Sequence, residues 1–180
     1  MCSSDLRALV CAAVRETFEE SGVLLAGASP SDVLADVSTD EWEAERVALE
    51  AREQSLSELL ARRGLVLRAD LLRPLAHWIT PVVEHKRFDT RFFLAEVPAG
   101  QVCREAGTEA DSRLWVRPRE ALDAGLTMLP PTTVTLEALA DAPDVAAALA
   151  APREVRPVLP RFDVGPGDEV AFLLPGDPGY

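Results

Sequence analysis

Three glutamates stand close together near the start of the chain, in the stretch VRETFEESGV that runs from Val14 to Val23. Glu19 and Glu20 follow Glu16 by three and four residues, a spacing that puts all three carboxylates on one face of a helix. Carboxylate oxygens are the ligands that hard divalent cations prefer. The stretch therefore predicts a metal site, although a run of acidic residues is more commonly a solvated helix face.

The other face of this expected helix is apolar. Leu6, Val10, Val14 and Phe18 recur in steps of four, which is typical of a helix packed on a core. Gly22 is a natural stop, because glycine adopts the left-handed cap conformation without a clash at Cβ. The pattern predicts a half-buried helix that displays its carboxylates on the uncovered side.

The glutamate stretch resembles the second half of the Nudix box, G-x5-E-x7-R-E-U-x-E-E-x-G-U, in which U is an aliphatic residue. Thr17 stands where an aliphatic residue is usual. Six positions at fixed spacing match: Arg15, Glu16, Glu19, Glu20, Gly22 and Val23. A match of this length is far more specific than a lone glycine pattern.

The first half of the box has no match in the chain. Counting back along an uninterrupted motif places its glycine at Met1 and its glutamate at Arg7. We therefore expect the chain to begin partway through a longer protein. The remaining stretches are similar, in the same order, to the Nudix branch of peroxisomal coenzyme A diphosphatases and their bacterial relatives: LAHWITP (75–81), RFDTRFFLAEVP (87–98), LWVRPREAL (114–122) and MLPPTTVTLEAL (128–139).

The resemblance implies a role for each matched residue. Glu19 and Glu20 are expected to be metal ligands, Glu16 a ligand or the base that activates water, and Arg15 the residue that orients the carboxylates. Glu109 lies six residues before Trp115, where many Nudix proteins place an acidic residue near the metal; the alternative is an ordinary loop charge. The implied cofactor is Mg²⁺ or Mn²⁺, which neutralises phosphate oxygens and activates water.

The implied activity is hydrolysis of the diphosphate bond in a nucleoside diphosphate linked to another moiety. The branch resemblance favours coenzyme A or acyl-coenzyme A as that small-molecule partner. An alternative from another class stays open: a non-catalytic fragment or acidic interaction module that keeps only half of the Nudix box.

The predicted fold class is α/β (α+β), a Nudix-type mixed β-sheet between helices that is truncated at its N-terminus. We expect residues 1–180 to form one partial Nudix domain, with a helical insertion at 24–72 and a C-terminal extension of helices and a hairpin at 126–180. Ser55 and Glu58 have capping-box spacing inside a helical pair at 40–63, and Gly64 follows as a stop. A further strand is expected at 112–117.

The amino-acid composition limits the classes of partner that the chain can bind. The net charge of −12 argues against nonspecific binding to nucleic acid, which needs a basic surface. No apolar run reaches the length of a membrane span, and no signal peptide is evident. The three cysteines, Cys2, Cys11 and Cys103, have no metal-ligand spacing, so we expect a reducing, cytoplasmic compartment. A homodimer stays open, since a second copy could shield the apolar stripe.

Overall fold

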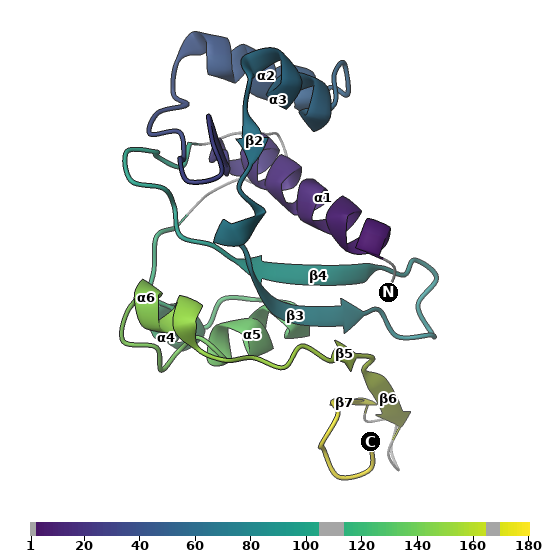
Figure 1. Cartoon of the computed structure of the whole chain (residues 1–180). Coiled ribbons are helices and arrows are strands. Elements are labelled where there is room, and N and C mark those ends of the chain that lie inside the picture. The colour runs from purple at the N-terminus through teal and green to yellow at the C-terminus, as the bar shows by residue number, and fades with distance from the viewer. Residues whose placement is uncertain (1–2, 105–113, 165–169) are drawn as a thin grey trace. The chain divides into compact units, whose positions relative to one another are not determined.

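The protein is described by a computed structural model, which covers residues 3–104, 114–164 and 170–180. The described chain divides into two compact units. Unit 1 comprises residues 1–73 and 95–115, and unit 2 comprises residues 74–94 and 116–180. Each unit is described by itself below, and Figure 1 labels the elements in chain order.

Unit 1 is built around the glutamate-bearing helix. It contains the helices α1 (Ser3–Ser21), α2 (Asp40–Glu50) and α3 (Leu56–Arg63), the short strands β1 (Ala26–Gly27) and β2 (Val66–Leu67), and the 3₁₀ turn η1 (Ala69–Leu71). β1 and β2 pair in antiparallel fashion, with Ala26 opposite Leu67 and Gly27 opposite Val66. This pairing joins the segments that lie on either side of the α2–α3 pair.

The ends of α3 follow from local sequence. The Ser55 hydroxyl accepts a hydrogen bond from the Glu58 backbone N–H, and the Glu58 carboxylate accepts one from the Ser55 backbone N–H. Gly64 closes the helix in the left-handed conformation, with φ of 65°. Both the capping box and the glycine stop were predicted from sequence and are confirmed.

The core of unit 1 is aliphatic and aromatic. Its fully buried side chains are Val14, Phe18, Leu24, Leu25, Leu49 and Leu59. The apolar stripe of α1 is therefore covered at its C-terminal half, whereas Leu6 at the other end is 52% exposed. Sequence pattern also favours Val47 on the buried side of the helical pair, but this residue is 47% exposed.

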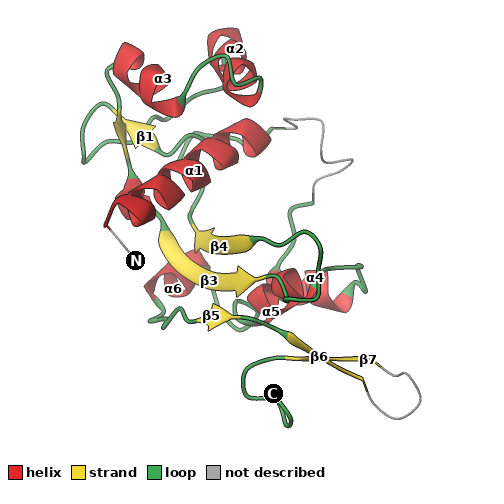
Figure 2. Ribbon diagram, turned by 90° about the vertical axis from the view of Figure 1, so that its right-hand side faces the viewer, coloured by secondary structure: helices red, strands yellow, loops and turns green. Residues whose placement is uncertain are grey.

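Unit 2 contains a mixed sheet and a separate hairpin. The strands β3 (Arg73–Ile79), β4 (Asp89–Leu94) and β5 (Pro157–Val158) form a sheet in the order β4-β3-β5. β3 runs parallel to β5 and opposite to β4 (Figures 1 and 2). The hairpin pairs β6 (Arg161–Val164) with β7 (Val170–Leu173), and the Phe162 and Phe172 rings meet edge to face at 5.5 Å.

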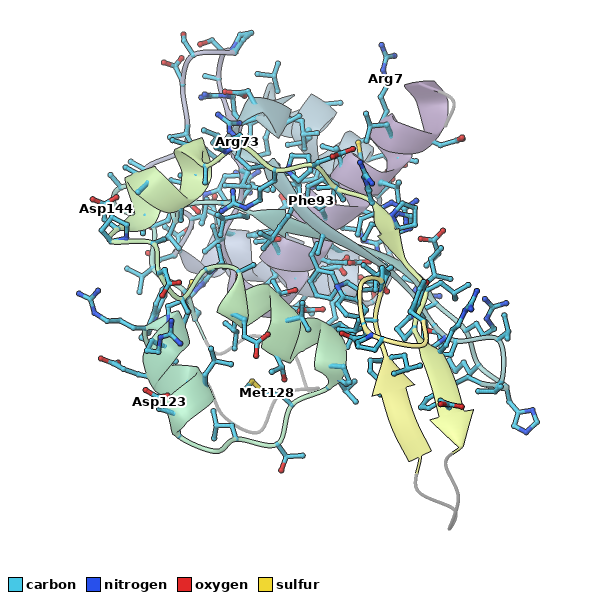
Figure 3. The ribbon with its side chains drawn as sticks, turned by 90° about the horizontal axis from the view of Figure 1, so that it is seen from below. Arg7, Arg73, Phe93, Asp123, Met128 and Asp144 are labelled. Atoms are coloured by element: carbon cyan, nitrogen blue, oxygen red, sulfur yellow. The ribbon has the colours of Figure 1, made fainter. Side chains whose placement is uncertain are left out.

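Three short helices complete unit 2. They are α4 (Pro118–Asp123), α5 (Pro130–Glu137) and α6 (Val145–Ala150). Prolines occupy the first turns of α4 and α5, where a missing N–H does no harm. Asp144, labelled in Figure 3 at the start of α6, caps that helix by accepting a hydrogen bond from the Ala147 backbone N–H. The strand predicted at 112–117 is wrong for its described part, because residues 114–117 are an exposed extended segment without a strand partner.

Candidate active site on the first helix

The glutamates of α1 are held in place by the packing of the opposite face of the helix. Val14 and Phe18 are fully buried, and the Phe18 ring meets the Trp42 ring edge to face at 6.3 Å. This anchoring leaves the Glu16 side chain 56% exposed but the Glu19 side chain only 16% exposed. The two carboxylates therefore experience different environments although they share one helix face.

Arg15 contacts two of the three carboxylates. Its Nη2 lies 3.2 Å from Glu16 Oε1, and its Nε lies 3.3 Å from Glu19 Oε1. The contact with Glu19 has the i to i+4 spacing that lets side chains on a helix meet. Arg15 thus offsets the repulsion between the neighbouring carboxylates of Glu16 and Glu19.

Glu19 is the electrostatically unusual member of the group. Burial raises its pKa above the ordinary value, and the nearby Glu16 and Glu50 charges raise it further. The charges of Arg15 and Arg52 act in the opposite direction without cancelling the rise. A half-buried carboxylate among other carboxylates gains from any added positive charge, which is what a divalent cation supplies.

Arg46 fastens the end of α1 to α2. Its side chain is 6% exposed, and its Nη1 donates to the Glu19 carbonyl oxygen at 2.8 Å. The same guanidinium pairs with Glu43 at 2.7 Å and with Glu50 at 2.9 Å. Sequence reasoning missed this residue. The spacings of Arg46 to Glu43 and to Glu50 predict ion pairs within α2. The neighbouring sequence does not predict the contact of Arg46 with α1.

The glycine at the end of α1 is enclosed by residues from a distant segment. Gly22 has φ of 70°, and a Cβ there would lie 2.9 Å from Arg104 Nε. The Arg104 backbone N–H donates to the Ser21 carbonyl oxygen at 2.9 Å, and its Nη2 donates to the Val37 carbonyl oxygen at 2.8 Å. The Gly22 of the motif therefore serves both as helix stop and as space for an arginine.

A glutamine holds the chain that leaves α1. The Leu24 backbone N–H donates to Gln101 Oε1 at 2.9 Å, while Gln101 Nε2 donates to the Leu24 and Leu34 carbonyl oxygens at 3.0 and 2.7 Å. Gln101 is 7% exposed, so these bonds satisfy a buried amide. Gln101, like Arg104, belongs to the segment that returns to unit 1 and could not be assigned from sequence.

The donor chemistry of the site suits a hard cation. Glutamate oxygens from Glu16, Glu19 and Glu20 are the ligand type that Mg²⁺ and Mn²⁺ accept. Within the described residues, no three His, Cys, Asp or Glu side chains converge as a ready-made metal cluster. Mg²⁺ commonly binds through one or two carboxylates with water and substrate phosphate completing its shell, so a full protein cluster is not required. Glu109 lies outside the described residues.

The buried histidine in the sheet of unit 2 has a hydrogen-bond partner within the same unit. His77 is 7% exposed, and its Nε2 lies 2.7 Å from Asp89 Oδ1, which also contacts Arg91. A buried imidazole with a carboxylate partner indicates a structural role for His77 in the sheet. His85 lies in the exposed connection between β3 and β4.

Comparison with known proteins identifies the family. A family model described as the NUDT19 Nudix domain matches residues 2–132, which is more than half of the chain. The chain belongs to the Nudix hydrolase family. This confirms the resemblance drawn from Arg15, Glu16, Glu19, Glu20, Gly22 and Val23.

Two relatives place this Nudix chain more closely. The crystal structure of a NUDIX hydrolase from Alicyclobacillus acidocaldarius is 32% identical with a TM-score of 0.72, covering 84% of this chain and 69% of that one. The fold class, a mixed α/β arrangement, is thereby confirmed. An acyl-coenzyme A diphosphatase NUDT19 from Xenopus laevis is 29% identical over 126 residues. That match covers 63% of this Nudix chain and only 33% of the relative's length. In the described part of the chain, no helix is long and apolar enough to cross a membrane.

Proposed function

We propose that the chain hydrolyses the diphosphate bond of a nucleoside diphosphate derivative, with coenzyme A or acyl-coenzyme A as the substrate class. The observation that carries the proposal is the matched half of the Nudix box on one anchored helix, where Arg15 contacts both Glu16 and Glu19. The similarity to an acyl-coenzyme A diphosphatase supports the choice of substrate. The spacing of Cys2, Cys11 and Cys103, which fits neither a metal site nor a paired disulfide framework, supports a reducing, cytoplasmic setting.

The residues divide the work as follows. Glu19 and Glu20, with Glu16, would hold Mg²⁺ or Mn²⁺, and the bound ion would supply positive charge to the phosphate oxygens and a polarised water. Glu16, the more exposed carboxylate beside Arg15, is open to solvent and can accept a proton from that water. Arg15, in contact with both Glu16 and Glu19, would offset their mutual repulsion and orient them. Arg46 fixes the backbone at Glu19, which preserves the positioning on which phosphoryl transfer depends.

Metal binding is tested by calorimetric titration with Mn²⁺. We expect the wild-type chain to bind the ion and the double variant Glu19→Gln with Glu20→Gln to lose binding. The matched control is Glu53→Gln with Glu137→Gln, which removes two exposed charges outside the site and should bind as the wild type does. If the Glu19/Glu20 variant bound Mn²⁺ as the wild type does, the metal site would have to lie elsewhere in the chain.

The reaction is tested with coenzyme A and Mg²⁺, following the release of adenosine 3′,5′-bisphosphate. The Glu19/Glu20 variant should lose more than about 100-fold in kcat/KM, because outer-shell partners of metal sites alone are worth 10- to 100-fold. Turnover of nucleoside triphosphates or sugar nucleotides, without turnover of coenzyme A, would refute the substrate class and leave the family unchanged. A folded chain that binds no metal and cleaves none of these substrates would favour the acidic interaction module instead.

A further inference from the structure

The turn that follows α2 holds an arginine in a backbone conformation that favours glycine. Arg52 has φ of 59°, and among the described residues it is the only one other than glycine with a positive φ. The Arg52 backbone N–H donates to the Leu49 carbonyl oxygen, and the Glu53 backbone N–H donates to the Ala48 carbonyl oxygen, each at 2.9 Å. These two bonds form a Schellman helix end, whose left-handed position is usually glycine. Arginine there costs conformational stability that glycine would not.

The other two helices of unit 1 end on glycine. Gly22 follows α1 with φ of 70°, and Gly64 closes α3 with φ of 65°. The end of α2 differs from both because it carries a long charged side chain. Residues in disfavoured backbone conformations gather at functional sites, where the surrounding structure holds them in place. The strain at Arg52 therefore indicates a role for its guanidinium group.

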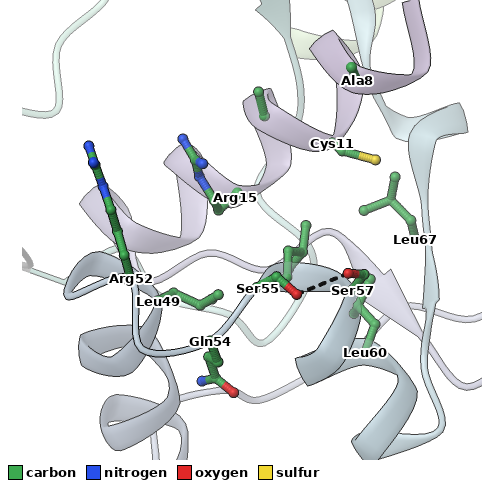
Figure 4. A pocket seen from close by; sticks show the side chains of 12 residues that line it. Ala8, Cys11, Arg15, Leu49, Arg52, Gln54, Ser55, Ser57, Leu60 and Leu67 are labelled. Carbon is green, nitrogen blue, oxygen red and sulfur yellow. Dashed lines mark hydrogen bonds between the residues drawn. The ribbon is translucent and has the colours of Figure 1, made fainter. Parts of the chain in front are cut away.

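The Arg52 side chain lies on the wall of a pocket beside α1. This pocket has a volume of about 490 Å³ and lies entirely within unit 1, and Arg15 lines it as well. Figure 4 shows the two guanidinium groups on the same side of the opening. Burial raises the pKa of Glu19, and the charges of Arg15 and Arg52 oppose that rise. Both cations thus lie within electrostatic range of this carboxylate.

The guanidinium group of Arg52 is exposed and has no hydrogen bond or ion pair within the described part of the chain. The nearby arginines Arg46, Arg62 and Arg63 differ, because each pairs with a glutamate. An arginine offers five N–H donors in a planar fork, which matches the oxygens of a phosphate group. Arg52 therefore has its full donor set available for an anionic ligand.

The balance of charge at the site favours this use of Arg52. Glu16, Glu19 and Glu20 together carry more negative charge than one divalent cation neutralises. Arg15 lies 3.2 Å from Glu16 and 3.3 Å from Glu19, so its charge already serves the carboxylates. Of the two arginines that line the pocket, Arg52 is thus the one whose charge can offset that of a phosphate group. A cation that the fold holds in place stabilises phosphate oxygens without reorganisation when they arrive.

We propose that Arg52 binds the non-bridging oxygens of the substrate diphosphate, together with the cation held by the α1 glutamates; this rests on the proposed function. The α2–α3 pair then supplies a substrate-binding residue in addition to packing against α1. The strained backbone of the turn is the cost of placing that side chain in the pocket.

Binding of a diphosphate that cannot be cleaved tests the proposal. The probe is α,β-methylene adenosine diphosphate, titrated by calorimetry in Mg²⁺. Arg52→Gly should raise its dissociation constant about tenfold or more, because a charge-assisted hydrogen bond is lost. Arg52→Lys keeps the charge without the planar fork and should lose less. The matched control is Arg156→Gly, which removes an exposed arginine of unit 2 that does not line the pocket, and it should bind as the wild type does.

Two further measurements separate substrate binding from a structural role. Arg52→Gly should bind Mn²⁺ at least as tightly as the wild type, because it removes a positive charge near Glu19 that opposes the metal. Its melting temperature should not fall, because glycine adopts φ of 59° without strain. A purely structural Arg52 would instead lower the melting temperature, Mn²⁺ binding and diphosphate binding together, and that result would overturn the proposal. Equal dissociation constants for the analogue in Arg52→Gly and the wild type would overturn it as well.

The role of Arg52 and the proposed activity fail in different ways. Diphosphate binding that depends on Arg52, in a chain that hydrolyses no substrate in Mg²⁺, would refute the activity and keep the role of Arg52. Hydrolysis of coenzyme A by Arg52→Gly with the kcat/KM of the wild type would keep the activity and refute the role of Arg52.

Discussion

At the scale of single residues, the matched glycine of the motif carries two separate constraints. Gly22 has a positive φ, which side chains disfavour, and it also makes room for Arg104. Gly64 has nearly the same φ of 65°, but no atom lies within 4 Å of the position that a Cβ would take there. The pair therefore separates the conformational contribution from the steric one.

We predict that Gly22→Ala destabilises the fold more than Gly64→Ala. Alanine in the left-handed region costs about 1 to 2 kcal/mol at either position. At position 22 the methyl group must also displace the Arg104 side chain from its bond to Val37, which adds about 1 kcal/mol. Urea unfolding of both variants measures the difference. Equal losses would mean that Arg104 moves aside freely.

At the scale of elements, α2 and α3 are tied together by one carboxylate. Glu45 on α2 contacts Arg62 and Arg63 on α3, the latter at 3.0 Å, and accepts from Gln54 in the turn between them. Arg63 also lies over the Trp42 ring at 4.8 Å. The Glu45 side chain is 13% exposed, so its interactions are only partly screened by water.

The stability that Glu45 contributes should depend on pH. Burial raises the pKa of its carboxyl, but the hydrogen bonds from Gln54 and Arg63, together with the charges of Arg62 and Arg63, outweigh that effect and leave the pKa below its ordinary value. A lowered pKa in the folded state stabilises the fold above the unfolded pKa, and this contribution is lost as the pH falls through the folded pKa. Glu45→Gln should therefore lose about 1 kcal/mol at pH 7 and progressively less in acid.

Urea unfolding between pH 7 and pH 3 tests this dependence. Glu53→Gln, an exposed change in the same turn, is the control and should stay within about 0.5 kcal/mol of the wild type throughout. A Glu45 effect that persists unchanged at pH 3 would contradict the assignment to its charge.

The elements predicted correctly are those whose signals are local. The stripe ending at Phe18, the Ser55–Glu58 capping box and Gly64 each specify structure within one or two helical turns, and α1 and α3 follow them. The ion pair between Arg15 and Glu19 could also be predicted from their spacing along the helix. Each of these contacts is set by neighbours along the chain.

The rest depends on segments that meet only after folding. Nothing near Arg104 or Gln101 indicates that they enclose the end of α1, and the contact of Arg46 with the Glu19 carbonyl joins two helices. The aliphatic alternation around Val116 favoured a strand, but residues 114–117 have no strand partner. Backbone pairing requires a neighbouring strand, and sequence pattern alone does not supply one. The metal role of Glu16, Glu19 and Glu20 stays a prediction, as does that of Glu109.

At the scale of the whole molecule, the net charge of −12 bears on stability as well as on partners. Carboxylates outnumber basic groups by 30 to 18, so the compact state carries mutual repulsion that salt can screen. The isoelectric point lies near pH 4.6, where that repulsion disappears.

We therefore predict that NaCl raises the melting temperature at pH 7.5 by several degrees between about 0.01 and 0.3 M, over which the screening length falls severalfold. Near pH 4.6 the same salt series should have little effect. Differential scanning calorimetry in the two buffers, with EDTA present to exclude divalent ions, makes the comparison. A melting temperature that is flat or falls with salt at pH 7.5 would show that local ion pairs dominate over the net charge.

The segment that follows α1 in this Nudix chain is held in place by one side-chain amide, that of Gln101. The oxygen and nitrogen of this amide take the places of a peptide C=O and N–H beside Leu24. One side chain thus makes the two hydrogen bonds that a neighbouring strand would otherwise make with its backbone. Almost any residue can make the backbone hydrogen bonds of a paired strand, because only backbone atoms take part. Glutamate, which differs from glutamine by a single atom group, would instead set a carboxylate against the carbonyl oxygens of Leu24 and Leu34. The segment that leaves the glutamate-bearing helix is thus exposed to point mutation in a way that ordinary strands are not.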